Sequence, residues 1–276
     1  AGNYAVNNDI HHFARVQKTY RPGIQMRGVG NRIAHNYIHD APHAGVLYEG
    51  NDHVMEFNEF TRVAEETGDV GAIYTCMDWT YMGTIIRHNY FHHIHGPGDL
   101  GCMTVYLDLP VGGAHIYGNV FYRLDRGFFT NSGRSIHIEN NIFVDCHPAI
   151  GFNAWRYPYM FQHGGSWKMV ERLEAMNYRQ PPYSTRYPDM LHIFEDGDPC
   201  LPRDNIIARN ISYGGTWFTL HDGELDFHIL SVRDNLIADR EILVRRRPDR
   251  KGYDTYGPDD REVVAEYEKY GNIVMD

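Results

Sequence analysis

An asparagine flanked by two apolar positions recurs through the chain and constrains the fold more than any other feature of the sequence. An apolar residue stands three positions before each asparagine, and another stands two positions after it in every copy except the one at Ser212. The first six copies follow one another at spacings of roughly 22 to 31 residues, a period typical of solenoid proteins. The copies are centred on Asn8, Asn36, Asn58, Asn89, Asn119, Asn141, Asn210 and Asn235.

A second short run of strand-forming residues lies between successive asparagines. Residues 45–48, 71–74 and 104–107 are examples, and no helical period separates them from the asparagine segments. Two or three short strands per repeat, closed by Gly and Asn corners, are typical of a right-handed parallel β-helix, an all-β solenoid. In that fold an inward asparagine at a corner can pair with the backbone and with the asparagine one coil away. We therefore predict this fold and a structural role for the asparagines.

One long interruption breaks the period. Residues 155–204 replace one or two corners, and within them residues 166–178 have the pattern of an amphipathic helix. The 276 residues are thus expected to form a single β-helix domain, with a partly helical insertion at residues 155–204 that covers one face. The first residues already lie inside a repeat, so we expect the chain to be a fragment that lacks an N-terminal portion.

Charge and composition limit the classes of partner that we expect for the chain. The formal net charge is −10, and most of the chain has no basic block, so nucleic acid is not an expected partner. No apolar run has the length of a membrane span, and the opening residues do not resemble a signal peptide. The four cysteines lie far apart and are expected to be buried thiols. Oligomeric state stays open.

The seventeen histidines do not predict a metal site. His11, His39 and His92 all fall three positions after a repeat asparagine, so they are expected to stack at a corner of the solenoid. Structural or substrate hydrogen-bonding roles are therefore expected for His39 and His43. We expect neither a metal nor a cofactor, since no P-loop, dinucleotide or serine-nucleophile motif occurs in a supporting context.

Polar side chains recur at one position of the second strands. Alternation turns this position outward if Val46, Ile73 and Tyr106 or their neighbours point inward. A polar line along one face of a β-helix would form the floor of a groove, which suits carbohydrate ligands that need many hydrogen bonds and aromatic contacts. The aligned residues are Glu49, Thr75, Asp108, Asn131 and Asn153, and nearby aromatic residues are Tyr20, Tyr48, Trp79, Tyr81 and Trp155.

Two aspartates are the candidates for chemistry. Asp69 lies in a turn bracketed by glycines, and Asp108 interrupts an apolar run. Glycosidic cleavage usually needs two carboxyl groups that flank the bond. Strict register would separate Asp69 from Asp108 by six strand positions, roughly 20 Å, so the turn at residues 65–70 must fold back over the strand. Glu49 and Asp78 are the rival acids.

The chain also resembles a known family. The stretches Glu66-Thr67-Gly68-Asp69-Val70-Gly71-Ala72-Ile73-Tyr74 and Val105-Tyr106-Leu107-Asp108, together with residues 29–43, 50–53 and 78–79, resemble the parallel β-helix glycosidases of glycoside hydrolase family 141. The resemblance implies retaining hydrolysis of α-L-fucosides or xylan, with Asp69 and Asp108 as the catalytic pair. It also implies a secreted or periplasmic location. Members often carry two consecutive acids after the Tyr-Leu pair, where this chain has Asp108-Leu109.

The sequence thus predicts a glycoside hydrolase that acts on plant or microbial polysaccharide. Asp69, in a loop shielded by neighbouring coils, is expected to be the acid, and Asp108, on an open groove floor, the nucleophile. The residues expected to contact substrate are Glu49, His39, His43, Asp78, Trp79, Tyr48 and Asn131.

Two other functions stay open at this point. A polysaccharide lyase can use the same fold, but its base is commonly Lys or Arg, and the four lysines of this chain lie off the groove line. A glycan-binding β-helix without catalysis is the second alternative, and substitution of both acids would leave its affinity almost unchanged. The lysines are Lys18, Lys168, Lys251 and Lys269.

Overall fold

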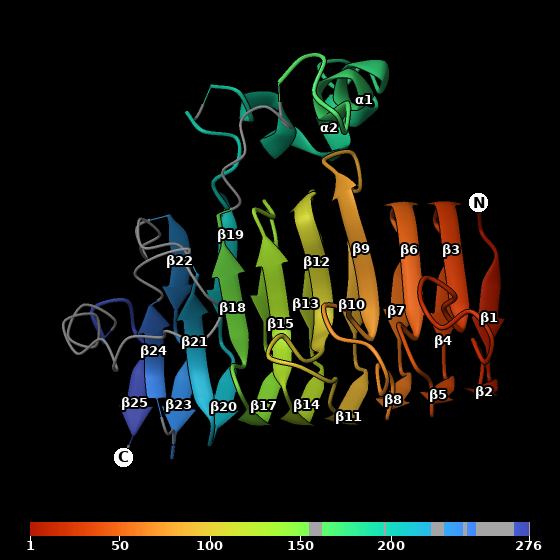
Figure 1. The fold of residues 1–276 in the computed structure, drawn as a ribbon. Coiled ribbons are helices and arrows are strands. Elements are labelled where there is room, and N and C mark those ends of the chain that lie inside the picture. The colour runs from red at the N-terminus through yellow and green to blue at the C-terminus, as the bar shows by residue number, and fades with distance from the viewer. Residues whose placement is uncertain (155–161, 196, 222–228, 240–241, 247–267, 276) are drawn as a thin grey trace.

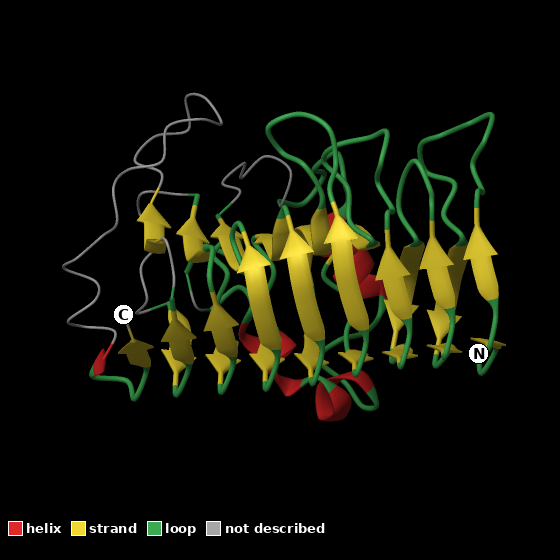
Figure 2. Ribbon diagram, turned by 90° about the horizontal axis from the view of Figure 1, so that it is seen from below, coloured by secondary structure: helices red, strands yellow, loops and turns green. Residues whose placement is uncertain are grey.

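Three parallel sheets run side by side along one axis in the computed structural model of the chain (Figure 1). The structure describes residues 1–154, 162–195, 197–221, 229–239, 242–246 and 268–275. In most of the coils that it describes, the chain contributes one strand to each sheet in turn, and each strand pairs in parallel with its equivalents in the neighbouring coils. Figure 2 shows the strands of successive coils stacked along the length of the molecule. The predicted parallel β-helix is therefore confirmed.

Sheet A contains the strands that precede the repeat asparagines. The predicted apolar column three positions before each asparagine is confirmed here, because Ile33, Met55, Ile86 and Ile116 occupy equivalent register positions and are all buried. The strands are β1 (Tyr4–Val6), β4 (Arg32–Ala34), β7 (Val54–Glu56), β10 (Thr84–Arg87), β13 (Ala114–Tyr117), β16 (His137–Glu139), β19 (Asn205–Ala208) and β22 (Leu230–Arg233).

Sheet B contains the strands that follow the asparagines. Its inward column includes a stack of four phenylalanine rings, Phe60, Phe91, Phe121 and Phe143, with centroids 4.6 to 5.0 Å apart. Such stacking buries large apolar side chains at the centre of the solenoid. The strands are β2 (Asp9–His11), β5 (Tyr37–His39), β8 (Glu59–Thr61), β11 (Tyr90–Ile94), β14 (Val120–Leu124), β17 (Ile142–Cys146), β20 (Ile211–Tyr213), β23 (Leu236–Ala238) and β25 (Ile273–Met275).

Sheet C contains the longest strands and carries the candidate site on its outer face. Its inward column includes Val46, Ile73, Val105 and Phe128, all fully buried. Tyr106, one of the residues expected to point inward, is offset from this column by one residue and faces outward. The strands are β3 (Ile24–Val29), β6 (Val46–Asn51), β9 (Ile73–Asp78), β12 (Met103–Val111), β15 (Arg126–Asn131), β18 (Ile150–Asn153), β21 (Thr216–Leu220) and β24 (Ile242–Arg246).

The repeat asparagines form the predicted ladder at the corner between sheets A and B. Asn119 is representative: its Nδ2 donates to Asn141 Oδ1 at 3.0 Å and to the Ile86 carbonyl oxygen at 2.9 Å. Its own Oδ1 accepts from the backbone N–H of Asn89 at 2.9 Å. The ladder continues to Asn272, whose Oδ1 accepts from the side chain of Asn235. Each side chain thereby satisfies backbone groups that the buried corner would otherwise leave unpaired.

The insertion contributes helices at the corner between sheets C and A. The predicted helix is shorter than residues 166–178 and spans α1 (Met169–Ala175), followed by α2 (Tyr183–Arg186) and a 3₁₀ helix, η2 (Pro188–His192). Figure 1 shows these helices beyond the end of β9. Met169 and Leu173 of α1 pack with Trp79 and Met82, which follow β9, in a second apolar cluster. The insertion therefore stands as a wall beside the outer face of sheet C.

Two further expectations concern the burial of the cysteines and the absence of a membrane span. Cys102, Cys146 and Cys200 are buried as predicted, whereas Cys76 is partly exposed. Among the residues that the structure describes, no helix combines the length and hydropathy that a membrane span requires.

Candidate active site

Asp108 lies on the outer face of β12, where the strand departs from regular pairing. The register between β12 and β9 shifts after the Asp108–Cys76 pair, and the next residue, Leu109, has a left-handed φ of 60°. Irregularities of this kind re-aim side chains and are frequent next to active sites. The neighbour of Asp108 across the sheet is Cys76 and not the predicted Thr75, which pairs with Leu107 and is buried.

Hydrogen bonds hold both oxygens of the Asp108 carboxylate. The Tyr74 hydroxyl donates to Oδ2 at 2.9 Å, and Asn131 Nδ2 donates to Oδ1 at 2.7 Å. Asn131 itself is oriented by Asn153, whose Nδ2 donates to Asn131 Oδ1 at 2.8 Å. The polar line predicted for Asp108, Asn131 and Asn153 therefore works as a relay that fixes the orientation of one carboxylate.

Asp69 approaches the surroundings of Asp108 from the corner between sheets B and C. Its backbone N–H donates to the Gly101 carbonyl oxygen at 3.1 Å, which holds the turn against the corner loop of the next coil. This contact requires glycine at position 68, because a Cβ there would lie 2.6 Å from the Pro97 carbonyl oxygen. The Tyr106 hydroxyl donates to Asp69 Oδ1 at 3.3 Å. The predicted folding back of the turn is thus what brings Asp69 over sheet C.

A short chain of contacts joins the two carboxylates. Asn131 Nδ2 donates to the Tyr106 hydroxyl at 2.9 Å as well as to Asp108. The steps from Asp69 Oδ1 through Tyr106 and Asn131 to Asp108 Oδ1 measure 3.3, 2.9 and 2.7 Å, so these two oxygens lie at most about 9 Å apart. This limit falls within the separations that paired glycosidase carboxylates use.

Burial distinguishes the two acids. Asp69 is exposed, whereas Asp108 is largely covered by its neighbours. Burial raises the pKa of Asp108, the neighbouring Asn131, Tyr106 and Tyr74 side chains oppose this effect, and the charge of Asp69 adds a smaller increase. The predicted shielding of Asp69 is therefore wrong, because its turn lies at the surface while the Asp108 side chain is enclosed by tyrosine and asparagine side chains.

A cleft of about 430 Å³ lies beside Asp108 on the side of the preceding coils, because Tyr74 and Cys76, the neighbours of Asp108, line it. Its floor is the outer face of β6 and β9, one wall comes from the insertion, and the opposite wall carries Tyr20 from the corner loop of the first coil. Aromatic and polar side chains together line it, as expected for a carbohydrate site. The lining residues include Tyr20, Glu49, Tyr74, Cys76, Tyr81, Trp167 and Arg172.

Three of the predicted substrate-contact residues lie in or beside this site. Asn131 binds Asp108 directly, as described above. Glu49 lines the cleft and pairs with Arg27 at 3.1 Å. His43 is buried, and its ring centroid lies 5.2 Å from that of Tyr20. These placements agree with the predicted site, and their contact with a substrate stays a prediction.

The other four predicted contact residues are buried or make contacts away from the acid pair. The Tyr48 side chain points into the solenoid core and Trp79 lies in the second apolar cluster, so neither ring is available to a ligand. Asp78 accepts from the Thr80 backbone N–H at 2.9 Å and is buried at the end of β9. His39 lies on sheet B between Asp9 and Asp40, away from sheet C. The alternation rule alone could have excluded Tyr48, since it precedes outward-facing Glu49.

The tyrosines that contact the acids were missed as site residues. Tyr74 and Tyr106 occupy equivalent positions on β9 and β12, and their ring centroids lie 5.3 Å apart. Their shared position two residues before Cys76 and Asp108 places both on the outer face, which is the signal that correct register would have provided. Among the described residues, no group of three or more His, Cys, Asp or Glu side chains is arranged to hold a metal ion.

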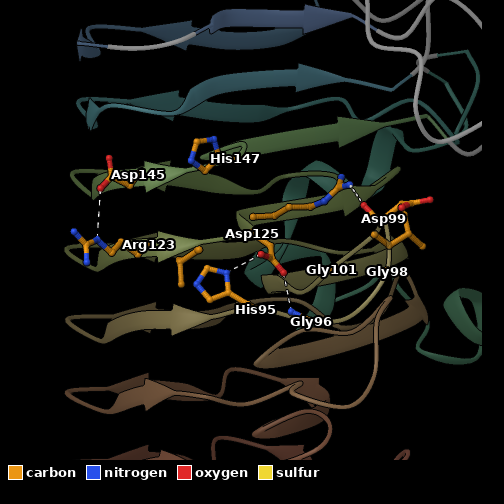
Figure 3. A pocket seen from close by; sticks show the side chains of 12 residues that line it. His95, Gly96, Gly98, Asp99, Gly101, Arg123, Asp125, Asp145 and His147 are labelled. Carbon is orange, nitrogen blue, oxygen red and sulfur yellow. Dashed lines mark hydrogen bonds and ion pairs between the residues drawn. The ribbon is translucent and has the colours of Figure 1, made fainter.

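A larger cavity of about 570 Å³ lies at the corner between sheets B and C (Figure 3). Several of its charged groups contact one another or the corner loop. Asp125 accepts from His95 Nδ1 and from the Gly96 backbone N–H, both at 2.7 Å, and Arg123 lies 3.7 Å from Asp145. Asp125 therefore anchors the loop through these two hydrogen bonds.

Comparison with known proteins agrees with the architecture. A family model described as "right handed beta helix region" matches residues 6–157, slightly more than half of the chain. Neither the curated proteins nor the solved structures include a match. The match also confirms the handedness predicted from the repeats. With three stacked parallel sheets and a family model that covers most of the coils, the chain belongs to the right-handed β-helix family.

Proposed function

We propose that this chain is a glycoside hydrolase that acts on plant or microbial polysaccharide, with Asp69 and Asp108 as its carboxylate pair. The observation that carries the proposal is the approach of these two carboxylates, from different coils, to within about 9 Å of each other through Tyr106 and Asn131. The adjoining aromatic cleft supports it, because a sugar chain on the floor of sheet C would pass beside both acids.

The environments of the two acids support a division of roles. Asp108, whose pKa is raised by burial, suits the general acid that protonates the glycosidic oxygen. Asp69, which is exposed, suits the carboxylate that attacks the anomeric carbon. In a retaining reaction, Asp108 would then act as the base that activates water against the glycosyl–enzyme bond. The resemblance to family 141 favours this retaining course and a fucoside or xylan linkage.

Release of reducing ends from fucosides, xylans and pectic glycans tests the proposal. Cleavage of one of these substrates by the wild-type protein, lost in Asp108→Asn, is the expected result. A polysaccharide lyase would instead form products with a conjugated double bond that absorbs ultraviolet light. A binding protein would retain equal glycan affinity in both forms without releasing any product.

The alkaline limit of activity should respond to the donors on Asp108. A general acid works only while protonated, so activity should fall as the pH rises through the pKa of Asp108. Because the hydrogen bond from Tyr74 favours the ionised form, Tyr74→Phe should raise that pKa and move the alkaline limb of kcat/KM to higher pH. Tyr81→Phe, another tyrosine of the cleft, should leave the limb in place. An alkaline limb that moves to lower pH in Tyr74→Phe would refute Asp108 as the acid.

A further inference from the structure

The corner loop of the first coil extends toward the site. Residues 12–23 connect β2 to β3, whereas only residues 40–45 connect the equivalent strands of the next coil. Phe13 packs against the solenoid core at the start of the loop. Lys18 forms an ion pair with Glu66, in the turn that leads to Asp69. The loop is therefore attached both to its own coil and to the segment that carries one of the acids.

Tyr20 occupies the part of this loop that faces the cleft. Its side chain lines the same cavity as Tyr74, Tyr81 and Trp167, yet the residue keeps 58% of its surface exposed. It adopts a left-handed φ of 54°, which is unfavourable for a bulky residue and indicates that its surroundings fix its position. The ring of buried His43 packs beside it, with centroids 5.2 Å apart. One face of the cleft is thus a supported but exposed aromatic ring.

The Tyr20 hydroxyl lies close to the catalytic candidates. Burial raises the pKa of Tyr20, and the charges of Cys76, Asp108 and Asp69 add to the increase, while a hydrogen bond with Tyr74 opposes it. Tyr20 therefore lines the same cleft as Tyr74, the residue that binds Asp108, while its ring remains exposed.

The charges around the cleft do not favour an acidic ligand. Glu49, the one acid among the lining residues, has a side chain that is 38% exposed and pairs with Arg27 at 3.1 Å. The cation of the insertion wall, Arg172, directs Nη1 to the Met77 carbonyl oxygen at 2.9 Å and lies 3.4 Å from Asp78. Both charged residues of the lining thus already have a partner of opposite charge, so a sugar that carries a carboxylate would find no unpaired cation among the lining residues. A neutral sugar can instead place its apolar face on an aromatic ring.

We propose that Tyr20 is a substrate-binding residue whose ring supports an uncharged sugar unit next to the acid pair. The choice of an uncharged sugar deepens the function proposed above and rests on the same site. The sugar ring packs on Tyr20 while its hydroxyl groups face the polar side chains of the cleft. This contact contributes to ground-state and transition-state binding alike, so its loss acts mainly on KM and on affinity.

Substitutions at Tyr20 distinguish the contribution of the aromatic ring to binding from that of the hydroxyl group. Tyr20→Ala should lower kcat/KM about tenfold, mainly through KM, and Tyr20→Phe should retain activity within about twofold. Tyr213→Ala is the matched control and should change neither parameter, because Tyr213 is a tyrosine of sheet B that is 50% exposed. Thermal unfolding should be unchanged in Tyr20→Ala because the side chain is largely exposed. Equal losses in Tyr20→Phe and Tyr20→Ala would overturn the role of the ring.

Affinity measurements keep this inference separate from catalysis. The Asp69→Asn/Asp108→Asn double variant, with and without Tyr20→Ala, would be titrated by calorimetry with a xylo-oligosaccharide, a fucosylated xyloglucan oligosaccharide and an oligogalacturonide. We expect a neutral ligand to bind most tightly and Tyr20→Ala to weaken it about tenfold. Tightest binding of the oligogalacturonide, no binding of any ligand, or no effect of Tyr20→Ala would overturn the inference. If the wild-type protein cleaves nothing while the affinity result holds, only the hydrolase proposal fails.

Discussion

Asp108→Asn is expected to lower kcat about thousandfold or more while the protein remains folded. Asparagine cannot donate the proton that the glycosidic oxygen needs, yet it has nearly the same shape as the carboxyl group. Its side-chain oxygen can accept from Asn131, and its amide can donate to the Tyr74 oxygen, so both contacts of the carboxylate have neutral counterparts. The loss should therefore appear in kcat and not in the amount of folded protein.

The same substitution should not lower the stability of the fold at neutral pH. Because the folded-state pKa of Asp108 is raised above its unfolded value, the native protein favours the protonated carboxyl group. The resulting stabilisation is fully present below the unfolded pKa and is lost as the pH rises through the folded pKa. At neutral pH, Asp108→Asn should thus be as stable as the wild type or more stable. A large fall in melting temperature at neutral pH would contradict this account of the buried acid.

Asp69→Asn should cause a comparable loss of activity, because it removes the carboxylate that attacks the anomeric carbon. Asp99→Asn is the matched control, since Asp99 is an exposed aspartate in the corner loop of the following coil. In a retaining enzyme, an external anion such as azide should restore turnover to Asp69→Gly and form a glycosyl azide. Full activity in Asp69→Asn would exclude this residue from the pair.

Asn119→Ala should lower the free energy of unfolding by about 3 kcal/mol, a large part of the stability of an ordinary domain. The substitution leaves the Asn89 backbone N–H and the Ile86 carbonyl oxygen without the Asn119 side chain in a buried corner, whereas Asn141 Oδ1 keeps its bond from the Asn119 backbone N–H. Each such unsatisfied group costs roughly 1 to 3 kcal/mol before the structure relaxes.

Urea unfolding measures this effect. Asn140→Gly provides the control, because Asn140 is an exposed corner residue with a left-handed φ of 55° that glycine adopts readily. Its free energy of unfolding should stay within about 0.5 kcal/mol of the wild-type value. Equal stability of Asn119→Ala and the wild type would mean that the ladder does not hold the coils together.

The architecture could be predicted because the solenoid repeats its physical requirements in every coil. A buried corner needs an asparagine, and the flanking strands need apolar residues at fixed distances from it, so Asn36 or Asn119 signals the same structure each time. Register on sheet C was harder, because Gly71 suggested a strand start where β9 begins only at Ile73. The predicted alignment of this strand was therefore shifted by one residue. It assigned Thr75 to the outer-face position that Cys76 occupies in the structure.

The candidate site could be predicted in part for the same reason. Asp69 and Asp108 stand out as acids in unusual surroundings, but their approach depends on Tyr106, which links a corner turn to a strand. Tyr48 and Trp79 appeared suitable as sugar contacts because sequence reveals residue type more readily than orientation. Tyr20 lies two coils away from Tyr74, and only the path of a loop with no repeat pattern brings them together.

Incorporation of oxygen from isotopically labelled water into the products tests the central claim most directly. Hydrolysis through Asp69 and Asp108 predicts one labelled oxygen at each new reducing end made by the wild-type protein, and none made by Asp108→Asn. Products without the label that carry a conjugated double bond, or equal product formation by the variant, would contradict it.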